Sequence, residues 1–202
     1  MRAIDAVVFD LGGVLVDWNP RHLYRQLFDD EADMECFLAE ICSLEWHVAH
    51  DLGHDIEASC AELAARHPEH ADLIRAWADR SEEMVRGAID GTVEILRALK
   101  EAGVPVYALS NMERETFPLC VERFDFLRWF DGYVISGLEG VVKPDRKIFE
   151  LLITRFDLVP SRTLFVDDSA VNVDAAIAAG LRAVQFVSPS ELITHLQGFG
   201  LL

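Results

Sequence analysis

The chain has 202 residues, of which 35 are acidic and 18 basic, so its formal net charge is −17. With 51% hydrophobic and 26% charged residues, it is predicted to form a globular domain with room for a smaller insertion. The acidic excess argues against nucleic acid and anionic membranes as partners, because both require clustered Lys and Arg. Its apolar runs fall short of the roughly 18 residues that a membrane span needs.

The cysteines and the first residues of the chain indicate the cellular compartment of the protein. The opening MRAIDAVVFD lacks the features of a signal peptide. The cysteines form no CxxC pair and fall within helical patterns, which predicts buried thiols in a reducing compartment; they are Cys36, Cys42, Cys60 and Cys120. We therefore expect a cytoplasmic protein.

An apolar run, AVVF at residues 6–9, ends at Asp10 and is followed by Gly12 and Gly13. An unbroken run of this kind is typical of a strand buried on both faces of a parallel sheet. Ligands bind beyond the carboxyl ends of such strands, so Asp10 is expected on the floor of a crevice. The two glycines let the backbone turn sharply and pass close to whatever Asp10 binds.

The next segment has a different pattern. Asn19 and Pro20 together indicate a helix start, and from there to about Arg86 the sequence shows helical periodicity and no convincing strand. We therefore predict a helical block inserted at residues 17–87, forming a lid over the crevice. The remaining residues, 1–16 and 88–202, are expected to form the core.

The second half alternates between strands and helices. Strands are predicted at residues 104–109, 133–135, 163–166 and 183–187, and helices at 92–102, 114–123, 145–156, up to Gly180 and from Ser188 onwards. Asp145 is expected to cap one helix, and Ser188 with Glu191 has the spacing of a capping box. Strict alternation predicts an α/β fold, a Rossmann-like core with a parallel sheet and right-handed crossovers.

Chemically capable side chains follow the predicted strands: Asp10, Ser110, Asn111, Lys143, Asp167 and Asp168. The carboxyl ends of parallel strands meet at one edge, so these residues are expected to converge. Three carboxylates close together repel one another unless a cation lies among them. Mg²⁺ binds such all-oxygen sites while keeping several waters and a substrate phosphate as further ligands. The composition of the site therefore predicts a magnesium ion and a small phosphorylated substrate.

Four motifs in this order resemble the haloacid dehalogenase superfamily of aspartate-nucleophile hydrolases, and the resemblance covers the whole chain. They are FDLGGVL at residues 9–15, LSN at 109–111, KPD at 143–145 and VDDSAVN at 166–172. The helical block between the first two motifs resembles the α-helical cap that this superfamily inserts there. The resemblance implies a Rossmann-like catalytic core with a helical cap, and an enzyme of the phosphatase branch.

The resemblance also implies catalytic and phosphate-binding roles. Asp10 would be the nucleophile that accepts a phosphoryl group as an aspartyl phosphate. Lys143 would neutralise charge on the phosphoryl group and on Asp10. Ser110, Asn111 and backbone N–H groups near Gly12 would bind the transferring oxygens.

The metal-binding roles come from the same motifs. Asp10, the carbonyl of Gly12 and Asp168 would ligate Mg²⁺. Asp167 and Asn172 would stand behind them, orienting the ligands and the metal-bound waters.

One position departs from the family pattern. Phosphatases of this superfamily mostly carry a second aspartate two residues after the nucleophile, as general acid and base, and here that position is Gly12. General acid catalysis is worth about 10²- to 10⁴-fold, and its loss matters most for poor leaving groups. We therefore expect a substrate with a good leaving group, such as a sugar phosphorylated at its anomeric carbon. The chain is similar to bacterial α-glucose-phosphate phosphatases in this respect.

Two alternatives stay open. In a 2-haloacid dehalogenase the aspartate attacks carbon without a metal, but that branch carries tyrosine at the position of Gly12 and lacks the pair Asp167 and Asp168. A non-catalytic binding protein would have kept the fold and lost turnover. The sequence does not specify the metabolite or the oligomeric state.

Residues of the predicted cap are candidates for substrate contact: Trp18, Arg21 and His47. Trp18 is equally typical of a core anchor at the hinge. His47, His50 and His54 lie at i, i+3 and i+7, which we interpret as a half-exposed polar face rather than a zinc site. If that face points into the crevice, one of these histidines would supply the missing proton.

Overall fold

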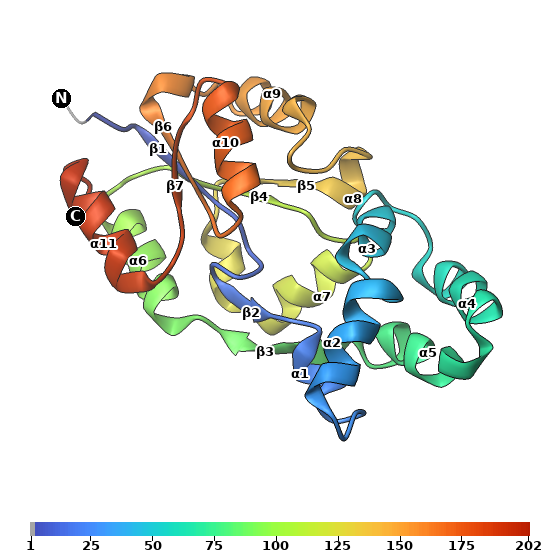
Figure 1. Ribbon diagram of the computed structural model, residues 1–202. Coiled ribbons are helices and arrows are strands. Elements are labelled where there is room, and N and C mark those ends of the chain that lie inside the picture. The colour runs from blue at the N-terminus through green and yellow to red at the C-terminus, as the bar shows by residue number, and fades with distance from the viewer. Residues whose placement is uncertain (1–2) are drawn as a thin grey trace.

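A parallel five-stranded sheet forms the centre of the fold in the computed structural model, which describes residues 3–202 (Figure 1). The strands lie in the order β5-β4-β1-β6-β7, with bounds Ala6–Phe9 (β1), Val106–Ser110 (β4), Gly132–Ile135 (β5), Thr163–Asp167 (β6) and Arg182–Gln185 (β7). The central strand β1 pairs in parallel with β4 and β6 and is buried along its whole length. The predicted α/β class and parallel Rossmann-like sheet are therefore confirmed.

Helices cover both faces of this sheet, as Figure 1 shows. One face packs against α6 (Asp90–Glu101), α7 (Thr116–Arg123) and α11 (Pro189–Gly198), and the other against α9 (Arg146–Arg155) and α10 (Ala170–Ala178). Successive strand residues point to opposite faces, so Val7 and Phe9 join one apolar cluster while Val8 joins the other. Burial on both faces explains why the sequence of β1 is an uninterrupted apolar run.

The helix starts of the second half carry the predicted caps. The Asp145 side chain accepts a hydrogen bond from the backbone N–H of Lys147 at the start of α9. The Ser188 hydroxyl accepts one from Glu191 N–H at the start of α11. Short elements complete this half: η3 (Asp125–Trp129), α8 (Ser136–Glu139) and η4 (Pro160–Arg162). Both predicted caps are therefore present in the structure.

A separate group of helices is inserted between β1 and β4. These inserted helices are α1 (Arg21–Tyr24), α2 (Glu31–Glu40), α3 (Leu44–Asp51), α4 (Ile56–Arg66) and α5 (Ala71–Asp79), with the short turns η1 (Pro68–His70) and η2 (Ser81–Met84). Their apolar side chains form a cluster of their own, which includes the fully buried Tyr24 and Trp77. The hydroxyl of Tyr24 donates to the carbonyl of Leu73 at 3.0 Å and ties α1 to α5. The inserted helices therefore have a core distinct from the two clusters beside the sheet.

A two-stranded antiparallel ribbon joins the inserted helices to the rest of the chain. β2 (Val16–Trp18) pairs with β3 (Val85–Ala88). The expectation of no strand from Asn19 to about Arg86 is therefore wrong at its C-terminal end, where β3 begins at Val85, and β2 is not among the predicted strands. The two strands are short and only partly buried, so they lack the apolar alternation that identifies a strand in a sequence.

The histidine face expected on the inserted helices is also corrected. α3 ends at Asp51, and Gly53 follows with a φ of 95°, so His54 is not on the same helix as His47 and His50. His50 is fully buried rather than half exposed. Its surroundings are described below with the site.

The thiols and the helix lengths complete the description. Cys36 is exposed, contrary to the expectation of a buried thiol, while the other three cysteines are buried and none forms a disulfide among residues 3–202. Within the same residues, no helix combines the length and apolarity that crossing a bilayer demands.

Candidate active site

The carboxyl edge of the sheet gathers the charged residues that the motifs contain. The Nζ of Lys143 lies 2.9 Å from Oδ1 of Asp10 and 2.6 Å from Oδ2 of Asp167. Asp10 follows β1 and Asp167 ends its neighbour β6, so strand pairing brings the two carboxylates together. Ser110 ends β4 on the other side of β1 and is 1% exposed. The structure thus places one buried lysine between two carboxylates at the carboxyl edge of the sheet.

Asn111 fixes the backbone of Lys143. Its Nδ2 donates to the carbonyl of Lys143 at 3.0 Å, and its Oδ1 accepts from the N–H of Lys143 at 2.8 Å. Both ends of the Asn111 amide therefore bind the backbone of Lys143. The motif predicts a different role for Asn111, which is to bind the oxygens of a phosphate. Burial alone would lower the pKa of Lys143, but the charges of Asp10 and Asp167 raise it, so the lysine stays protonated at neutral pH.

Asp167 is held from behind by the start of α10. Its carboxylate accepts hydrogen bonds from the N–H of Ser169 at 2.9 Å and from Nδ2 of Asn172 at 3.0 Å. With Lys143 on its other side, the carboxylate is completely buried. Asn172 and Asp167 therefore orient the lysine, and through it they orient Asp10.

The two glycines in the loop after β1 differ in the space that a side chain would have. Gly13 has a φ of +70°, and a Cβ there would lie 2.4 Å from Oδ2 of Asp168, so any side chain would displace that carboxylate. At Gly12, by contrast, a Cβ would meet no heavy atom of the described chain within 4 Å. The carboxylate of Asp168 thus lies against the loop backbone. The space beside Gly12 is open at the position where the superfamily places its second aspartate.

The charges of this edge fit a divalent cation. Asp10, Asp167 and Asp168 offer oxygen atoms that lie within 4.8 Å of one another. Burial raises the pKa of Asp10 against the opposing effect of Lys143, and burial with the neighbouring Asp167 raises the pKa of Asp168. The site therefore holds more negative charge than one lysine balances. A set of carboxylate oxygens in this state suits Mg²⁺, which binds through one or two carboxylates and keeps waters for a substrate phosphate.

The candidate substrate contacts of the inserted segment lie in different surroundings. Trp18 on β2 stacks on the ring of His47, with ring centroids 5.5 Å apart. Arg21 forms a two-point ion pair with Glu35 of α2, with both N–O distances 2.5 Å. The structure thus brings Trp18 and His47 together, whereas the charge of Arg21 is engaged within the inserted helices.

A second group of titratable side chains lies where α3 meets the core; we call it the α3 cluster, and its members are His47, His50, Asp51 and Glu113. The Nδ1 atoms of the two histidines are 3.2 Å apart, and Glu113 brings an oxygen within 4.8 Å of ring nitrogens of both. Oδ1 of Asp51 is 3.7 Å from Nε2 of His47. Neither Asp51 nor Glu113 belongs to the sequence motifs or to the predicted site residues.

Weak signals for these two residues exist in the sequence. Asp51 follows His47 by four positions, which places both on one helix face. Glu113 comes two residues after the LSN motif. That the two acids meet depends on how α3 docks, which periodicity alone does not specify.

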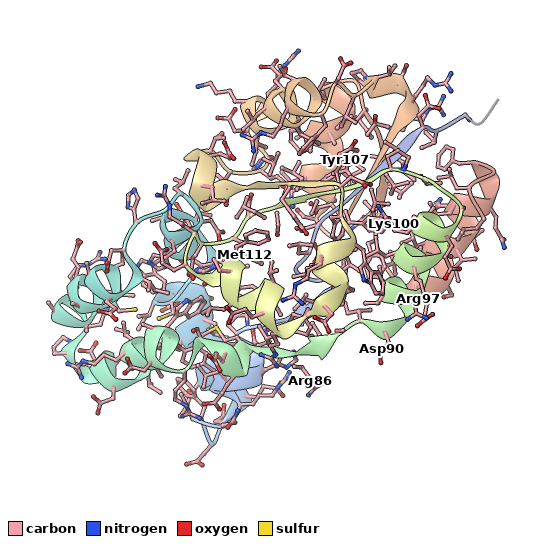
Figure 2. All side chains as sticks on the ribbon, turned by 180° about the vertical axis from the view of Figure 1, so that it is seen from behind. Arg86, Asp90, Arg97, Lys100, Tyr107 and Met112 are labelled. Atoms are coloured by element: carbon pink, nitrogen blue, oxygen red, sulfur yellow. The ribbon has the colours of Figure 1, made fainter. Side chains whose placement is uncertain are left out.

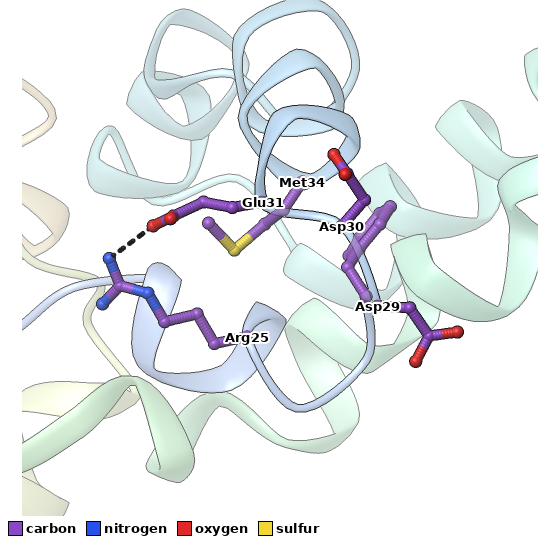
Figure 3. A pocket seen from close by; sticks show the side chains of 6 residues that line it. Arg25, Asp29, Asp30, Glu31 and Met34 are labelled. Atoms are coloured by element: carbon purple, nitrogen blue, oxygen red, sulfur yellow. Dashed lines mark hydrogen bonds and ion pairs between the residues drawn. The ribbon is translucent and has the colours of Figure 1, made fainter.

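A shallow hollow of about 260 Å³ lies elsewhere, on the inserted helices (Figure 3). It is lined by Arg25, Phe28, Asp29, Asp30, Glu31 and Met34, and the Arg25–Glu31 ion pair of 3.2 Å spans part of it. None of the residues gathered at the sheet edge lines it. The hollow is therefore separate from the chemistry described above.

An aspartate at the end of a central parallel strand, beside a buried lysine and further acidic residues, defines a class of α/β hydrolase. The model of the haloacid dehalogenase-like hydrolase family matches residues 4–180, and the chain belongs to this family. It is 30% identical over 187 residues to the sesquiterpene phosphatase astK of Aspergillus oryzae, covering 87% of this chain and 86% of that protein. It is 25% identical over 189 residues to a phosphorylated carbohydrates phosphatase of Thermotoga maritima, covering 90% and 84%.

A solved structure shows the same fold. The HAD family enzyme of Bacteroides thetaiotaomicron, determined in complex with magnesium and inorganic phosphate, superimposes with a TM-score of 0.68 at 20% identity. The match covers 92% of this chain and 95% of that one. The chain is thus a HAD-like hydrolase that shares the fold of this enzyme.

Proposed function

We propose that the chain is a Mg²⁺-dependent phosphatase that cleaves a small phosphorylated metabolite through an aspartyl phosphate on Asp10. The observation that carries this proposal is Lys143, buried between Asp10 and Asp167 at the carboxyl edge of the sheet. Phosphoryl transfer needs positioning and charge stabilisation more than any other contribution from a protein. A fixed ammonium beside a carboxylate nucleophile provides both.

The proposed reaction has two steps. In the first, an oxygen of Asp10 attacks phosphorus and the bond to the leaving oxygen breaks; in the second, water attacks the aspartyl phosphate and releases inorganic phosphate. Lys143 neutralises charge on the nucleophile and the transferring oxygens, and Ser110 with neighbouring N–H groups binds those oxygens. Asp10, Asp168 and the carbonyl of Gly12 would hold Mg²⁺, which when bound would stabilise the negative charge of the phosphoryl group.

For the substrate, we propose a sugar phosphate with a good leaving group. The support is the absence of a side chain at Gly12, which leaves the core without the usual acid for the leaving oxygen. The Thermotoga maritima relative is named as a phosphatase of phosphorylated carbohydrates. The Aspergillus oryzae relative is named as a sesquiterpene phosphatase, so an apolar alkyl phosphate belongs in the same screen.

The inserted helices would act as a cap at residues 17–87, with the core at 1–16 and 88–202. Their separate apolar core and the β2–β3 ribbon support this division. Trp18 and His47, stacked at the ribbon end, would be its substrate-facing residues. Three buried unpaired thiols fit the proposed cytoplasmic location, where thiols stay reduced.

The test is a phosphatase screen of the purified full chain with Mg²⁺ over sugar, aryl and alkyl phosphates. Asp10→Asn should be inactive on every substrate, because the amide is not a nucleophile for phosphorus. Asp174→Asn, which changes an exposed aspartate of α10, is the matched control and should keep full activity. An Asp10→Asn protein as active as wild type would contradict the proposal.

The dehalogenase alternative uses the same fold, since a solved dehalogenase is among the structural neighbours. Gly12 and the pair Asp167 and Asp168 disfavour it, because the acidic pair has no role in a metal-free attack on carbon. A non-catalytic binder is disfavoured by the intact set of Asp10, Lys143 and Asp168. Turnover of a 2-haloacid in the presence of EDTA would favour the dehalogenase.

A further inference from the structure

The proposed phosphatase lacks an obvious proton donor, and this inference rests on that proposed function. A leaving alcohol departs as a strongly basic alkoxide unless a proton reaches it, and even an anomeric hydroxyl benefits. The space beside Gly12, where the superfamily places its acid, is open. The donor therefore has to come from another part of the chain.

The end of α3 lies at the required edge of the sheet. A Cβ at Gly53, two residues beyond α3, would lie 3.1 Å from the carbonyl oxygen of Gly137 in α8. Gly137 in turn donates its N–H to the carbonyl of Met112 at 3.0 Å, and Met112 directly follows the LSN motif. Figure 1 shows α3 beside α8, and Figure 2 labels Met112 in the loop after β4, between the sheet and the inserted helices. This packing brings the C-terminal end of α3 close to the loop that follows Ser110 at the end of β4.

Asp51 is the buried carboxyl group of that last turn. It is 7% exposed, and its oxygen lies 3.7 Å from Nε2 of His47, beyond hydrogen-bond distance. Charged groups of the core also act on it: Asp10 at the end of β1, Lys143 in the motif loop, and Glu113 after β4. The charge of Asp51 therefore interacts with the charges at the sheet edge, although Asp51 is part of an inserted helix.

The pKa of Asp51 suits proton transfer at neutral pH. Burial, with the charges of Glu113 and Asp10, raises the pKa of Asp51 from 3.8 to about 7, against the opposing effect of Lys143. General acids and bases work best when their pKa lies near the working pH. Asp51 therefore exchanges a proton at neutral pH, as an exposed aspartate does not.

The neighbours of Asp51 are less suitable. Burial and the charge of His50 lower the pKa of His47 to about 4, and burial with the charge of His54 lowers that of His50 to about 4, so both rings are neutral near pH 7 and weak acids. Burial also raises the pKa of Glu113, but the hydrogen bond that its carboxylate accepts from the hydroxyl of Thr116 at 2.5 Å opposes this rise. Within the α3 cluster, the group whose pKa is raised to near neutral pH is thus Asp51.

We propose that Asp51 is the general acid and base of the reaction, supplied from α3 in place of the missing aspartate at position 12. In the first step the bond between phosphorus and the leaving oxygen breaks, and that oxygen takes the proton of Asp51. In the second step the Asp51 carboxylate takes a proton from the attacking water while the bond between phosphorus and Asp10 breaks. Inorganic phosphate leaves and Asp51 is protonated again, so each turnover consumes one water and no other reactant.

The test measures kcat/KM, which reports the first phosphoryl transfer, over a series of aryl and alkyl phosphate monoesters that span good to poor leaving groups. Asp51→Asn should leave 4-nitrophenyl phosphate within about threefold of wild type, because that leaving group needs no proton, and should lower the poorest alkyl phosphates by about 10²-fold or more. Asp51→Glu should recover part of the loss. Asp55→Asn, which changes the exposed cap of α4, should have no effect on the slope.

A measurement on the wild-type protein guards against misfolding of the variant. The dependence of kcat/KM on the leaving group should be shallow at about pH 6 and steeper at about pH 8.5, because Asp51 loses its proton in between. Titration of another protein group would change all substrates alike, and the rates are compared for the substrate dianions because the second ionisation of the phosphate itself depends on the leaving group. An active wild type whose slope changes neither with pH nor in Asp51→Asn would overturn this inference alone, whereas a wild type inactive on every phosphate would overturn the proposed function and the inference together.

Discussion

The side-chain amide of Asn111 forms hydrogen bonds of 3.0 and 2.8 Å with the carbonyl and the N–H of Lys143. The backbone of Lys143, whose ammonium group lies between Asp10 and Asp167, is therefore positioned by a neutral residue in another loop. These two hydrogen bonds join the loop after β4 to the loop between α8 and α9.

Asn111→Ala should lower kcat while leaving the fold intact. Displacement of a catalytic group by about 1 Å costs about 10²-fold in rate, and the loss of two partly buried hydrogen bonds should lower the free energy of unfolding by about 1–3 kcal/mol. Steady-state kinetics with 4-nitrophenyl phosphate and urea unfolding measure both. Asn19→Ala, which removes the hydrogen bond that Arg21 N–H donates to Asn19 Oδ1 in the inserted segment, is the matched control and should affect only stability. Equal kcat values in Asn111→Ala and wild type would show that the lysine keeps its place unaided.

Asp51 should make the wild type less stable as the pH rises. Its folded pKa of about 7 lies above its ordinary value of 3.8, so between these values the folded state binds a proton that the unfolded state has lost, and stability falls with increasing pH. At 1.36 kcal/mol per unit the full effect is about 4 kcal/mol. Because Asp51→Asn does not titrate, its free energy of unfolding relative to wild type should increase by about 2 kcal/mol between about pH 5.5 and about pH 8. A constant difference across this window in urea titrations would contradict the raised pKa.

Removal of Mg²⁺ should abolish activity and lower thermal stability. A ligand at a hundredfold excess over its Kd stabilises the folded state by about 2.7 kcal/mol, so Mg²⁺ should raise the Tm of EDTA-treated wild type by several degrees. Asp168→Asn should lose most of this Tm shift because it loses one carboxylate of the acidic group, whereas Asp174→Asn should retain it. Calorimetry with and without Mg²⁺ gives the shifts, and phosphatase activity that persists in EDTA would rule out the proposed metal.

Substitutions at the two loop glycines should have opposite outcomes. Gly12→Asp faces open space and should raise kcat/KM for alkyl phosphates, by up to about 10²-fold where no other acid reaches the leaving oxygen. Gly13→Ala should abolish activity, because its φ of +70° and the contact with Asp168 leave no room for a side chain. The comparison of Gly12→Ala with Gly13→Ala, each assayed for activity and near-UV circular dichroism, separates loop geometry from the acid. Inactive Gly12→Ala would show that the open space is needed for substrate.

The core could be predicted from the sequence because its signals are local. A strand buried on both faces is a continuous apolar run, as at residues 6–9, and the caps at Asp145 and Ser188 act on adjacent N–H groups. Parallel pairing then places the strand ends together without further information. The contact of Lys143 with Asp10 and Asp167 follows from that topology.

The inserted segment could not be predicted to the same depth because its contacts are long-range. β2 and β3 are recognisable only once Val16 lies opposite Ala88, and neither sequence alternates. Whether the histidine side of α3 faces solvent or core depends on its docking against α8, which no periodicity specifies. For this reason neither the position of Asp51 nor the ion pair of Arg21 with Glu35 can be predicted from the sequence.

The β2–β3 ribbon is the place where the inserted helices join the core. Everything between Trp18 and Val85 leaves the core and returns to it at one place, so its length and composition can vary without changing the order of the five sheet strands. In this chain the excursion also carries Asp51. If this segment were exchanged for that of a relative, the specificity for the leaving alcohol and the group that protonates it would change together. The nucleophile that attacks phosphorus would remain that of the original core.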